Sequence, residues 1–426
     1  MEYVFRLGIR LTLFLLFAVH FSIGQTIQVN TKSDQFDYEK LARIDTVINS
    51  SIKNNWVKGV VTIIVQDGKV VQHKAYGYAN EANKIMMQPD QLFRIASQTK
   101  AITSTGIMIL YEQGKILLDA PVSQYIPEFG KMTVIDKFND KDTTYTTVPA
   151  KRPITIRDLL THTSGLDYPG IGSQNMQAIY AKEGITAGFN MHPKGQKLGD
   201  AMKKLAALPL VHQPGEKWTY GLNTDLLGYV IEVVSGQNLS DFLTRNIFTP
   251  LGMKDTYFNV PPAKAKRLAS VYTEDSLHKV IEWTSNTMPA SADYPLLEKD
   301  YFSGGADLTS TAFDYAIFMQ MMLNKGRYNG HQILSPRTVE MMTSSQLNFH
   351  FNGTNDFGLG FEIVSDLGGA RGPRNAGSFA WGGYFGTTYW ADPKAKLVCL
   401  IMTQQIPNSH GELGSKFQNM VYASMK

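Results

Sequence analysis

The strand-like segments of this 426-residue chain lie near its two ends, and mostly helical patterns lie between them. Strand patterns occupy residues 59–65, 69–76, 359–364, 386–391 and 397–402. The first two flank Asp67-Gly68, the strongest hairpin signal in the chain, and Asp392-Pro393 marks a turn between the last two. Since strands must pair, this distribution predicts one sheet assembled from both ends of the chain.

Helical periodicity surrounds these strands. Apolar residues recur at helical spacing over 37–54, and further helices are predicted at 97–113, 310–324 and 411–424. Between 116 and 299, polar loops alternate with short helical patterns at 156–160, 199–208 and 225–234. Residues 167–197 contain five glycines, which favours an irregular loop. We therefore predict an α+β fold, with an α/β domain formed by 37–115 and 300–426 and a helical domain with long loops at 116–299.

The first 24 residues have the pattern of a signal peptide. Arg6 and Arg10 precede an apolar run over 11–21, and small residues follow at 22–24. The pattern predicts cleavage before Gln25 and an exported protein, periplasmic or secreted. The apolar run is short for a membrane span, although an uncleaved anchor is the alternative. No later stretch is long and apolar enough for a second span, so no stable membrane span is expected after cleavage.

Composition excludes several classes of function. Charged residues make up 18% of the chain with a net charge of +4 and no long basic run, so nucleic acid is not an expected partner. The single cysteine, Cys399, excludes an intrachain disulfide and any cysteine-rich metal site. The chain has no H-E-x-x-H, no phosphate-loop or dinucleotide fingerprint and no G-x-S-x-G. Neither a metal nor a cofactor is expected.

The remaining candidate for chemistry is Ser97-Gln98-Thr99-Lys100. On a helix, residues three apart share one face, with Cβ atoms roughly 5–6 Å apart. A desolvated lysine there can lose its proton and accept one from the serine. The S-x-x-K spacing also occurs at Ser50 and Ser276, but only Ser97 follows an apolar lead and opens a long apolar helix. An N-cap serine beside a surface lysine is the alternative.

Several segments of the chain together resemble a known family. The segment Leu92-Phe-Arg-Ile-Ala-Ser-Gln-Thr-Lys100 resembles the active-serine segment of class C β-lactamases and penicillin-binding-protein-like serine hydrolases. The resemblance continues through 114–122, 154–166, 250–253 and Ser303-Gly-Gly305, and covers nearly the whole chain after residue 40. It implies the β-lactamase/transpeptidase-like fold, in which an antiparallel sheet flanked by helices is joined by an inserted all-α domain, with the active site between them.

The resemblance also implies roles for individual residues. Ser97 would be the nucleophile, Lys100 the activating amine, and Tyr220 the proton relay that takes the place of the family's catalytic tyrosine. The chain then departs from the family pattern, because Leu222 occupies the usual asparagine position and Asn223 comes one residue later. His162, in a helix-ending turn, is expected to be structural.

Where lactamases carry Lys-Thr-Gly, this chain has Trp381-Gly382-Gly383, which resembles the esterase branch of the family. The two glycines would let substrate approach the backbone, and the backbone N–H groups of Ser97 and Tyr384 would form the oxyanion hole. The lost lysine removes a cation for a substrate carboxylate. Arg371 and Arg374 could replace that cation, or could be solvated loop charges.

These observations predict an exported serine hydrolase that forms an acyl-enzyme on Ser97 and acts on small-molecule esters or amides. One alternative is a β-lactamase or D-amino-acid peptidase that acts on cell-wall fragments. Another is a non-catalytic relative that only binds peptidoglycan. The sequence makes no prediction of oligomeric state.

Overall fold

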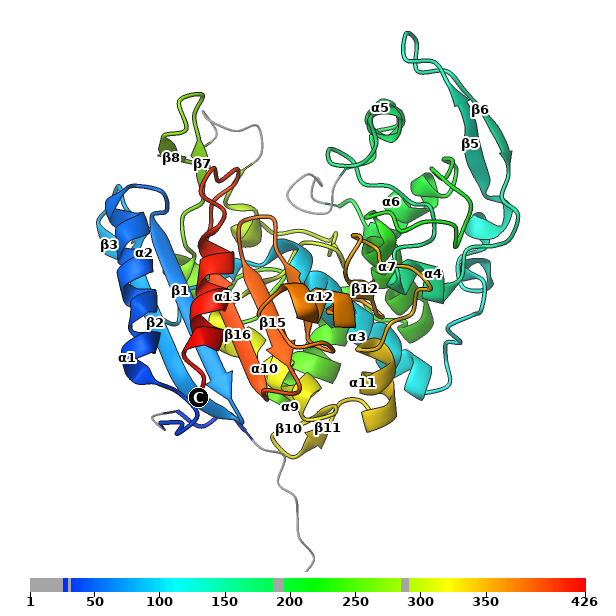
Figure 1. Ribbon diagram of the computed structural model, residues 1–426. Helices are drawn as coiled ribbons and strands as arrows, with labels where there is room; N and C mark the ends of the chain where they lie inside the picture. Colours follow the sequence, from blue (N-terminus) through cyan, green and yellow to red (C-terminus); the bar gives the residue numbers. More distant parts are fainter. Residues whose placement is uncertain (1–25, 30–31, 187–194, 285–290) are drawn as a thin grey trace, which may run out of the picture.

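An eight-stranded antiparallel sheet built from both ends of the chain forms the centre of the molecule (Figure 1). The computed structural model describes residues 26–29, 32–186, 195–284 and 291–426, so the predicted signal peptide at 1–24 lies outside the described residues. In sheet order the strands are β12 (Asp356–Phe357), β13 (Glu362–Ile363), β14 (Phe379–Gly382), β15 (Thr388–Asp392), β16 (Leu397–Met402), β1 (Gly59–Gln66), β2 (Lys69–Asn80) and β3 (Ile85–Met86).

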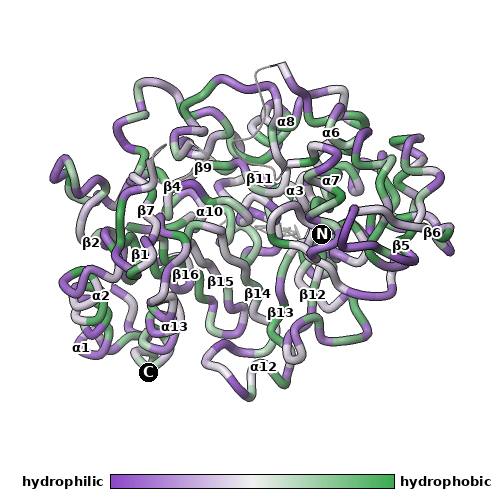
Figure 2. The backbone as a smooth tube through the Cα atoms, turned by 90° about the horizontal axis from the view of Figure 1, so that it is seen from above, coloured by the Kyte–Doolittle hydropathy of each residue, from purple (hydrophilic) through white to green (hydrophobic). Residues whose placement is uncertain are grey.

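The pairing of β1 with β16 joins the two chain ends in the middle of the sheet. Val61 lies opposite Met402 and Val65 lies opposite Val398, and β1 pairs with β2 on its other side. Figure 2 shows these strands side by side from above. The predicted antiparallel sheet is therefore confirmed, including the hairpin at Asp67-Gly68.

Helices cover both faces of this sheet, which explains why every residue of β1 is buried. On one face, α1 (Tyr38–Leu41), α2 (Arg43–Lys53) and α13 (Leu413–Ala423) enclose a core with Val60 and Ile64. On the other face, α10 (Ala312–Leu323) packs on β1, β15 and β16, and α3 (Thr99–Glu112) belongs to the same core as Val61 and Ile63. The predicted helix at 37–54 is divided, because α1 ends at Leu41 and α2 begins at Arg43.

The middle of the chain is helical but also contains strands. Its helices are α4 (Ile156–Leu160), α5 (Gln174–Lys182), α6 (Leu198–Leu205), α7 (Asn223–Ser235), α8 (Leu239–Leu243) and α9 (Thr249–Leu251). One hairpin precedes these helices, formed by β5 (Thr133–Phe138) with β6 (Tyr145–Pro149), and another follows them, formed by β7 (Tyr272–Glu274) with β8 (Val280–Glu282). The expectation of an all-α insertion was therefore too narrow. The expected loop at 167–197 contains α5, and its residues 187–194 lie outside the described part.

Short elements complete the fold. These are the strand pairs β4 (Phe93–Arg94) with β9 (Thr309–Ser310) and β10 (Arg327–Tyr328) with β11 (His331–Gln332), and the helices α11 (Pro336–Met342) and α12 (Asp366–Arg371). The pairing of β4 with β9 matters for the site, because β4 leads directly to Ser97 and β9 follows Ser303-Gly-Gly305.

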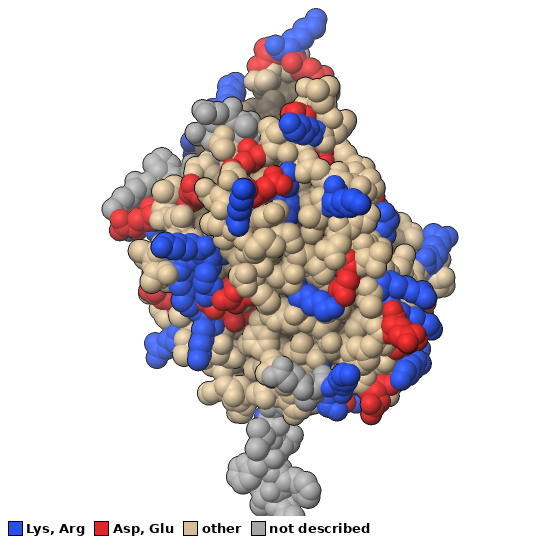
Figure 3. Space-filling view, turned by 90° about the vertical axis from the view of Figure 1, so that its left-hand side faces the viewer, with Lys and Arg blue, Asp and Glu red and all other residues tan. Residues whose placement is uncertain are grey.

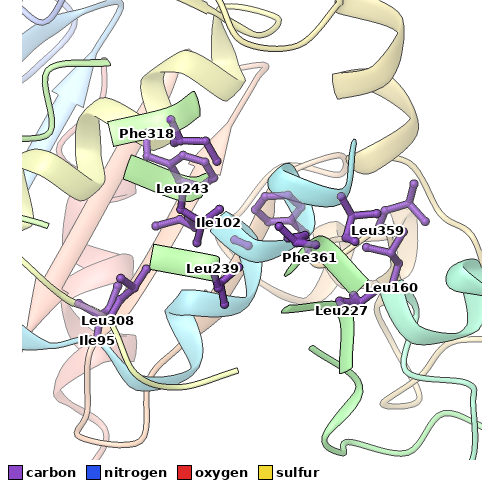
Figure 4. Packing of buried hydrophobic residues seen from close by; sticks show 14 of the residues in the cluster. Ile95, Ile102, Leu160, Leu227, Leu239, Leu243, Leu308, Phe318, Leu359 and Phe361 are labelled. Atoms are coloured by element: carbon purple, nitrogen blue, oxygen red, sulfur yellow. The ribbon is translucent and has the colours of Figure 1, made fainter. Parts of the chain in front are cut away.

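One continuous core ties α3 to the sheet domain and to the middle segment. Ile102 on α3 lies near Leu239 and Leu243 of α8 and Phe318 of α10, as Figure 4 shows. Gly106 permits the close approach, because a Cβ there would lie 2.9 Å from Ile231 Cδ1 and 3.0 Å from Leu243 Cδ2. The division into domains at 116 and 299 stays a prediction.

The surface beside β2 and β3 carries charges of both signs (Figure 3). Lys74 on β2 pairs with Asp45 on α2 at 2.7 Å, and Lys58 pairs with Glu81 at 2.5 Å. Lysines on this face are thus paired with acidic side chains. Among the described helices, none combines the length and the apolar character that crossing a membrane would need.

Candidate active site

Ser97 lies at the junction between a 3₁₀ helix and the buried helix α3. The 3₁₀ helix spans Ala96–Gln98 and continues directly into α3 at Thr99. The helix predicted to begin at Ser97 thus begins as a 3₁₀ turn. Ala96 has a φ of +42°, in the left-handed region that residues other than glycine rarely adopt, and its side chain is fully buried. Packing therefore holds a strained backbone next to Ser97.

Two proton-carrying side chains contact the Ser97 hydroxyl. The Tyr220 hydroxyl donates to Ser97 Oγ at 2.6 Å, and Lys100 Nζ donates to the same atom at 3.3 Å. Lys100 also donates to the Gly305 carbonyl oxygen at 2.7 Å, and only 2% of the residue is exposed. The structure thus brings together the three residues that sequence reasoning selected, from the 3₁₀ helix, from α3 and from the segment before α7.

Aromatic rings fix the position of Tyr220. Tyr168 stacks on it with centroids 5.5 Å apart and planes 7° apart, and His162 lies 5.1 Å away. Lys100 Nζ lies 4.7 Å from the centroid of the Tyr220 ring and 5.4 Å from that of Tyr168. An amine over these rings is attracted by their π-electrons, so both tyrosines help to hold the Lys100 side chain at this position.

Asn223, which comes one residue after the asparagine position of the family pattern, bonds to His162 and Ser164. Its amide lies 2.9 Å from Nδ1 of His162, and its Oδ1 accepts from Ser164 Oγ at 2.5 Å. Burial, aided by the charge of Lys100, holds the pKa of His162 well below its usual value, so the ring is neutral. His162 contacts Tyr220 and Asn223 and makes no hydrogen bond to Ser97, which fits the structural role expected for it.

An open cavity of about 610 Å³ lies in front of Ser97. Its lining includes all the site residues that the sequence suggested apart from the buried Lys100, namely Ser97, Tyr220, Trp381, Gly382, Gly383 and Tyr384. Trp381 and Gly382 form the end of β14, where Trp381 pairs with Tyr389 of β15. The other lining residues come from β13 and β14, from β15 and the turn before it, from the residues before and within α13, and from the loops that carry Ile171 and Arg374.

Gly383 allows the end of β14 to pack against the chain that leads to Ser97. A Cβ on Gly383 would lie 2.3 Å from Thr387 Oγ1 and 2.4 Å from the Ile95 carbonyl oxygen. Its amide donates to the Thr387 carbonyl oxygen at 2.7 Å. The glycine therefore sets the separation between the segments that carry Ser97 and Tyr384, the two backbone donors expected to form the oxyanion hole.

Sequence reasoning missed the aromatic cluster beside the cavity. Trp218 lies 4.8 Å from Phe351 and 6.4 Å from Trp381, and Phe357 lies 5.5 Å from Trp381, all between ring centroids. These rings come from three separate segments, so only the fold brings them together. The sequence did contain one indication that Trp218 lies at the site. Trp218 precedes Tyr220 by two residues, and side chains two apart point to the same side of an extended chain.

One pair of opposite charges lies in the cavity wall. Arg374 Nη2 is 3.6 Å from Glu362 Oε1, and the two side chains are 18% and 16% exposed. Arg371, the other arginine considered from the sequence, lies exposed at the end of α12. Arg374 is therefore the one of the two that reaches the site, and Glu362 offsets its charge.

Within the described residues, no three His, Cys, Asp or Glu side chains gather as ligands for a metal ion. The groups that contact one another at the site are the Ser97 hydroxyl, the Lys100 amine and the Tyr220 phenol. A hydroxyl in contact with a phenol and an amine, next to glycine-rich backbone, is an arrangement suited to acyl transfer through a covalent serine intermediate.

Comparisons with known proteins agree with this geometry. A family model described as Beta-lactamase matches residues 44–416. Protein Rv1367c of Mycobacterium tuberculosis is 34% identical over 369 residues, which cover 83% of this chain and 87% of that protein. Esterase EstB of Burkholderia gladioli is 28% identical over 407 residues, with coverages of 90% and 95%. The structure of EstCE1, described as a hydrolase with promiscuous acyltransferase activity, superimposes with a TM-score of 0.77 at 26% identity, over 90% of this chain and 99% of EstCE1.

Proposed function

The chain belongs to the beta-lactamase family of serine hydrolases, and on this premise we propose that it hydrolyses uncharged esters or small amides through an acyl-enzyme on Ser97. The observation that carries the proposal is the double contact on Ser97 Oγ, from the Tyr220 hydroxyl at 2.6 Å and from Lys100 Nζ at 3.3 Å. A serine held in this way can lose its proton as it attacks.

The reaction then proceeds in two halves. Ser97 Oγ attacks the carbonyl carbon while its proton passes to the Tyr220–Lys100 pair, and the backbone N–H groups of Ser97 and Tyr384 stabilise the oxyanion. The bond to the leaving alcohol or amine breaks as the same pair returns the proton to it. Water repeats the sequence on the acyl-enzyme and releases the acid, which restores the free Ser97 hydroxyl.

Two features of the cavity favour uncharged esters. Trp381 stands where a lactamase has a lysine, and an indole offers apolar contact rather than charge. Arg374 has Glu362 at 3.6 Å, so its charge is already offset. A substrate carboxylate without a free cation in a partly dry site costs several kcal/mol. EstB, which is named an esterase, is similar to this chain over nearly its whole length.

A second candidate is a β-lactamase or D-amino-acid peptidase that acts on cell-wall fragments. Arg374 favours it, because a carboxylate that displaced Glu362 would gain a bidentate partner inside the cavity. A non-catalytic peptidoglycan-binding relative is the third possibility. The close packing of Lys100 and Tyr220 on Ser97 argues against it, because binding alone does not need this arrangement.

We also propose that the protein is exported, on the signal-peptide pattern of residues 1–24. Cell fractionation with N-terminal sequencing tests this directly. A mature chain that begins at Gln25 in an exported fraction supports the proposal, and a full-length chain retained in the cytoplasm contradicts it.

The proposed reaction is tested by labelling and by kinetics on one preparation. A fluorophosphonate probe should modify Ser97 in a peptide map, and Ser97→Ala should lose both the label and hydrolysis by orders of magnitude with an unchanged melting temperature. The kcat/KM for p-nitrophenyl butyrate should exceed that for nitrocefin. Faster hydrolysis of nitrocefin, or strong labelling by a fluorescent penicillin, would instead support the lactamase or peptidase.

A further inference from the structure

A buried carboxylate that the proposed reaction does not use lies behind Lys100. Asp225 is in the first turn of α7, and it is fully buried. Its Oδ1 accepts from Ser303 Oγ at 2.5 Å, whereas Oδ2 is buried without a hydrogen-bond partner among the described residues. Burial of a carboxylate oxygen without a hydrogen bond costs folding free energy. A nearby positive charge or a bound proton is therefore needed to offset that cost.

The positive charge that faces Asp225 is that of Lys100. A Cβ built on Gly305 would lie 2.4 Å from Asp225 Oδ2 and 3.4 Å from Lys100 Nζ, so both groups border the same glycine. Lys100 donates to the Gly305 carbonyl oxygen on this side and to Ser97 on the other. Neither acceptor is a carboxylate, so Asp225 is placed to supply the countercharge.

Other ionisable groups around Lys100 are already engaged. Asp307 pairs with Lys299 at 2.7 Å, and Asp167 accepts bonds from Ser173 and from the Tyr168 amide. The remaining groups that face this region, which are His162, Tyr168, Tyr220 and Tyr301, are not carboxylates. Asp225 is thus the carboxylate next to Lys100 that has no cationic partner of its own.

The two charges stabilise each other across the glycine. Burial raises the pKa of Asp225, while the Ser303 hydroxyl, Lys100 and the Gly305 amide act in the opposite direction. The N-terminus of α7 adds its positive dipole end, because Asp225 lies in its first turn. Tyr220 lies in the segment just before α7, so this part of the chain brings both the Tyr220 phenol and the Asp225 carboxylate close to Lys100.

We infer that Asp225 is a positioning residue whose buried carboxylate supplies the countercharge that holds Lys100 against Ser97 and Gly305. The inference rests on the proposed acyl-enzyme reaction, in which Lys100 is the amine that contacts Ser97.

The test is the pH dependence of kcat/KM for p-nitrophenyl butyrate in the parent and in Asp225→Asn. Loss of a negative charge makes proton loss easier for every nearby group, so both limbs of the pH profile should move to lower pH by about one to two units. Asp307→Asn is the matched control, since it removes a buried carboxylate that already has Lys299 as a partner, and it should leave both limbs in place.

A lower kcat in Asp225→Asn with both limbs unmoved would overturn the inference, because a purely structural role lowers activity without shifting the profile. The same shift in Asp307→Asn would overturn it as well, since the effect would not be specific to Asp225.

A second measurement does not depend on hydrolysis. Lys100→Met leaves Asp225 buried beside an apolar side chain, so the melting temperature at neutral pH should fall. Adding Asp225→Asn to that variant should raise it again, because the uncompensated charge is gone. A double variant no more stable than Lys100→Met would refute the charge pairing. If Ser97 is not labelled but stability is restored, the proposed function fails while the pairing stands.

Discussion

Substitution of Gly383 tests how the oxyanion hole is built. In Gly383→Ala the new Cβ would lie 2.3 Å from Thr387 Oγ1 and 2.4 Å from the Ile95 carbonyl oxygen, where ordinary van der Waals contact begins at 3.4 Å. The Thr387 hydroxyl can rotate away, but the backbone oxygen of Ile95 cannot. The turn that carries Tyr384 must therefore move by about 1 Å away from the segment that carries Ser97.

A displacement of this size should affect catalysis more than folding. Misplacement of a catalytic group by about 1 Å can cost roughly a hundredfold in rate, whereas overpacking costs about 1–3 kcal/mol of stability. We therefore expect kcat/KM for p-nitrophenyl butyrate to fall by about two orders of magnitude, mainly in kcat, with a drop of a few degrees in melting temperature.

The neighbouring glycine provides the control. In Gly382→Ala the nearest atoms are the Thr387 carbonyl oxygen at 3.2 Å and Thr388 Oγ1 at 3.9 Å, so the chain need hardly move. Its kcat and melting temperature should stay near those of the parent, and a raised KM would indicate that substrate passes close to this backbone. Equal activity of Gly383→Ala and Gly382→Ala would refute the argument that Gly383 sets the position of Tyr384.

Further predictions concern proton transfer, charge and stability. Lys100→Ala and Tyr220→Phe should each lower turnover strongly, and the double variant should be little worse than the weaker single one; losses that multiply would show independent roles. Glu362→Gln should free Arg374 and raise kcat/KM for nitrocefin relative to p-nitrophenyl butyrate by up to roughly tenfold, and an unchanged ratio would show that Arg374 does not reach the substrate. Burial raises the pKa of Asp314 to about 6. Because the folded chain binds this proton more tightly than the unfolded chain, the free energy of unfolding should fall as the pH rises from about 4 to about 6, by on the order of 2–3 kcal/mol. Urea titrations of Asp314→Asn should show a smaller slope than the parent, since Asp307, whose pKa burial raises to about 7, still contributes; a slope equal to the parent's would count against a contribution from Asp314.

The sequence predicted the parts of the fold whose signals are local. The strand Leu397–Met402 was placed at its observed bounds, because a fully apolar run between turn residues has few other solutions. Ser97 and Lys100 were found together because one helix face fixes their spacing. Tyr220 required the family resemblance, since nothing local links it to a serine more than a hundred residues earlier.

The parts that the sequence did not predict leave no periodic signal. All five residues of β6 are exposed, so the hairpin with β5 shows no alternation of buried and exposed positions. Asp225 resembles an ordinary acidic residue in the first turn of a helix, and only the fold reveals that it is buried opposite Lys100. The contact of Trp218 with Phe351 likewise joins segments that only tertiary packing brings together.

The pairing of β1 with β16 has a consequence for how the protein is made. Met402 is synthesised more than three hundred residues after its partner Val61. Until then the β1–β2 hairpin carries an unpaired hydrogen-bonding edge of apolar residues, which is a template for aggregation. A chain that stops before β16 would retain Ser97, Lys100 and Tyr220 but lack the middle of the sheet. Nascent chains of this protein should therefore depend on a chaperone, and premature termination should yield insoluble protein rather than a shortened enzyme.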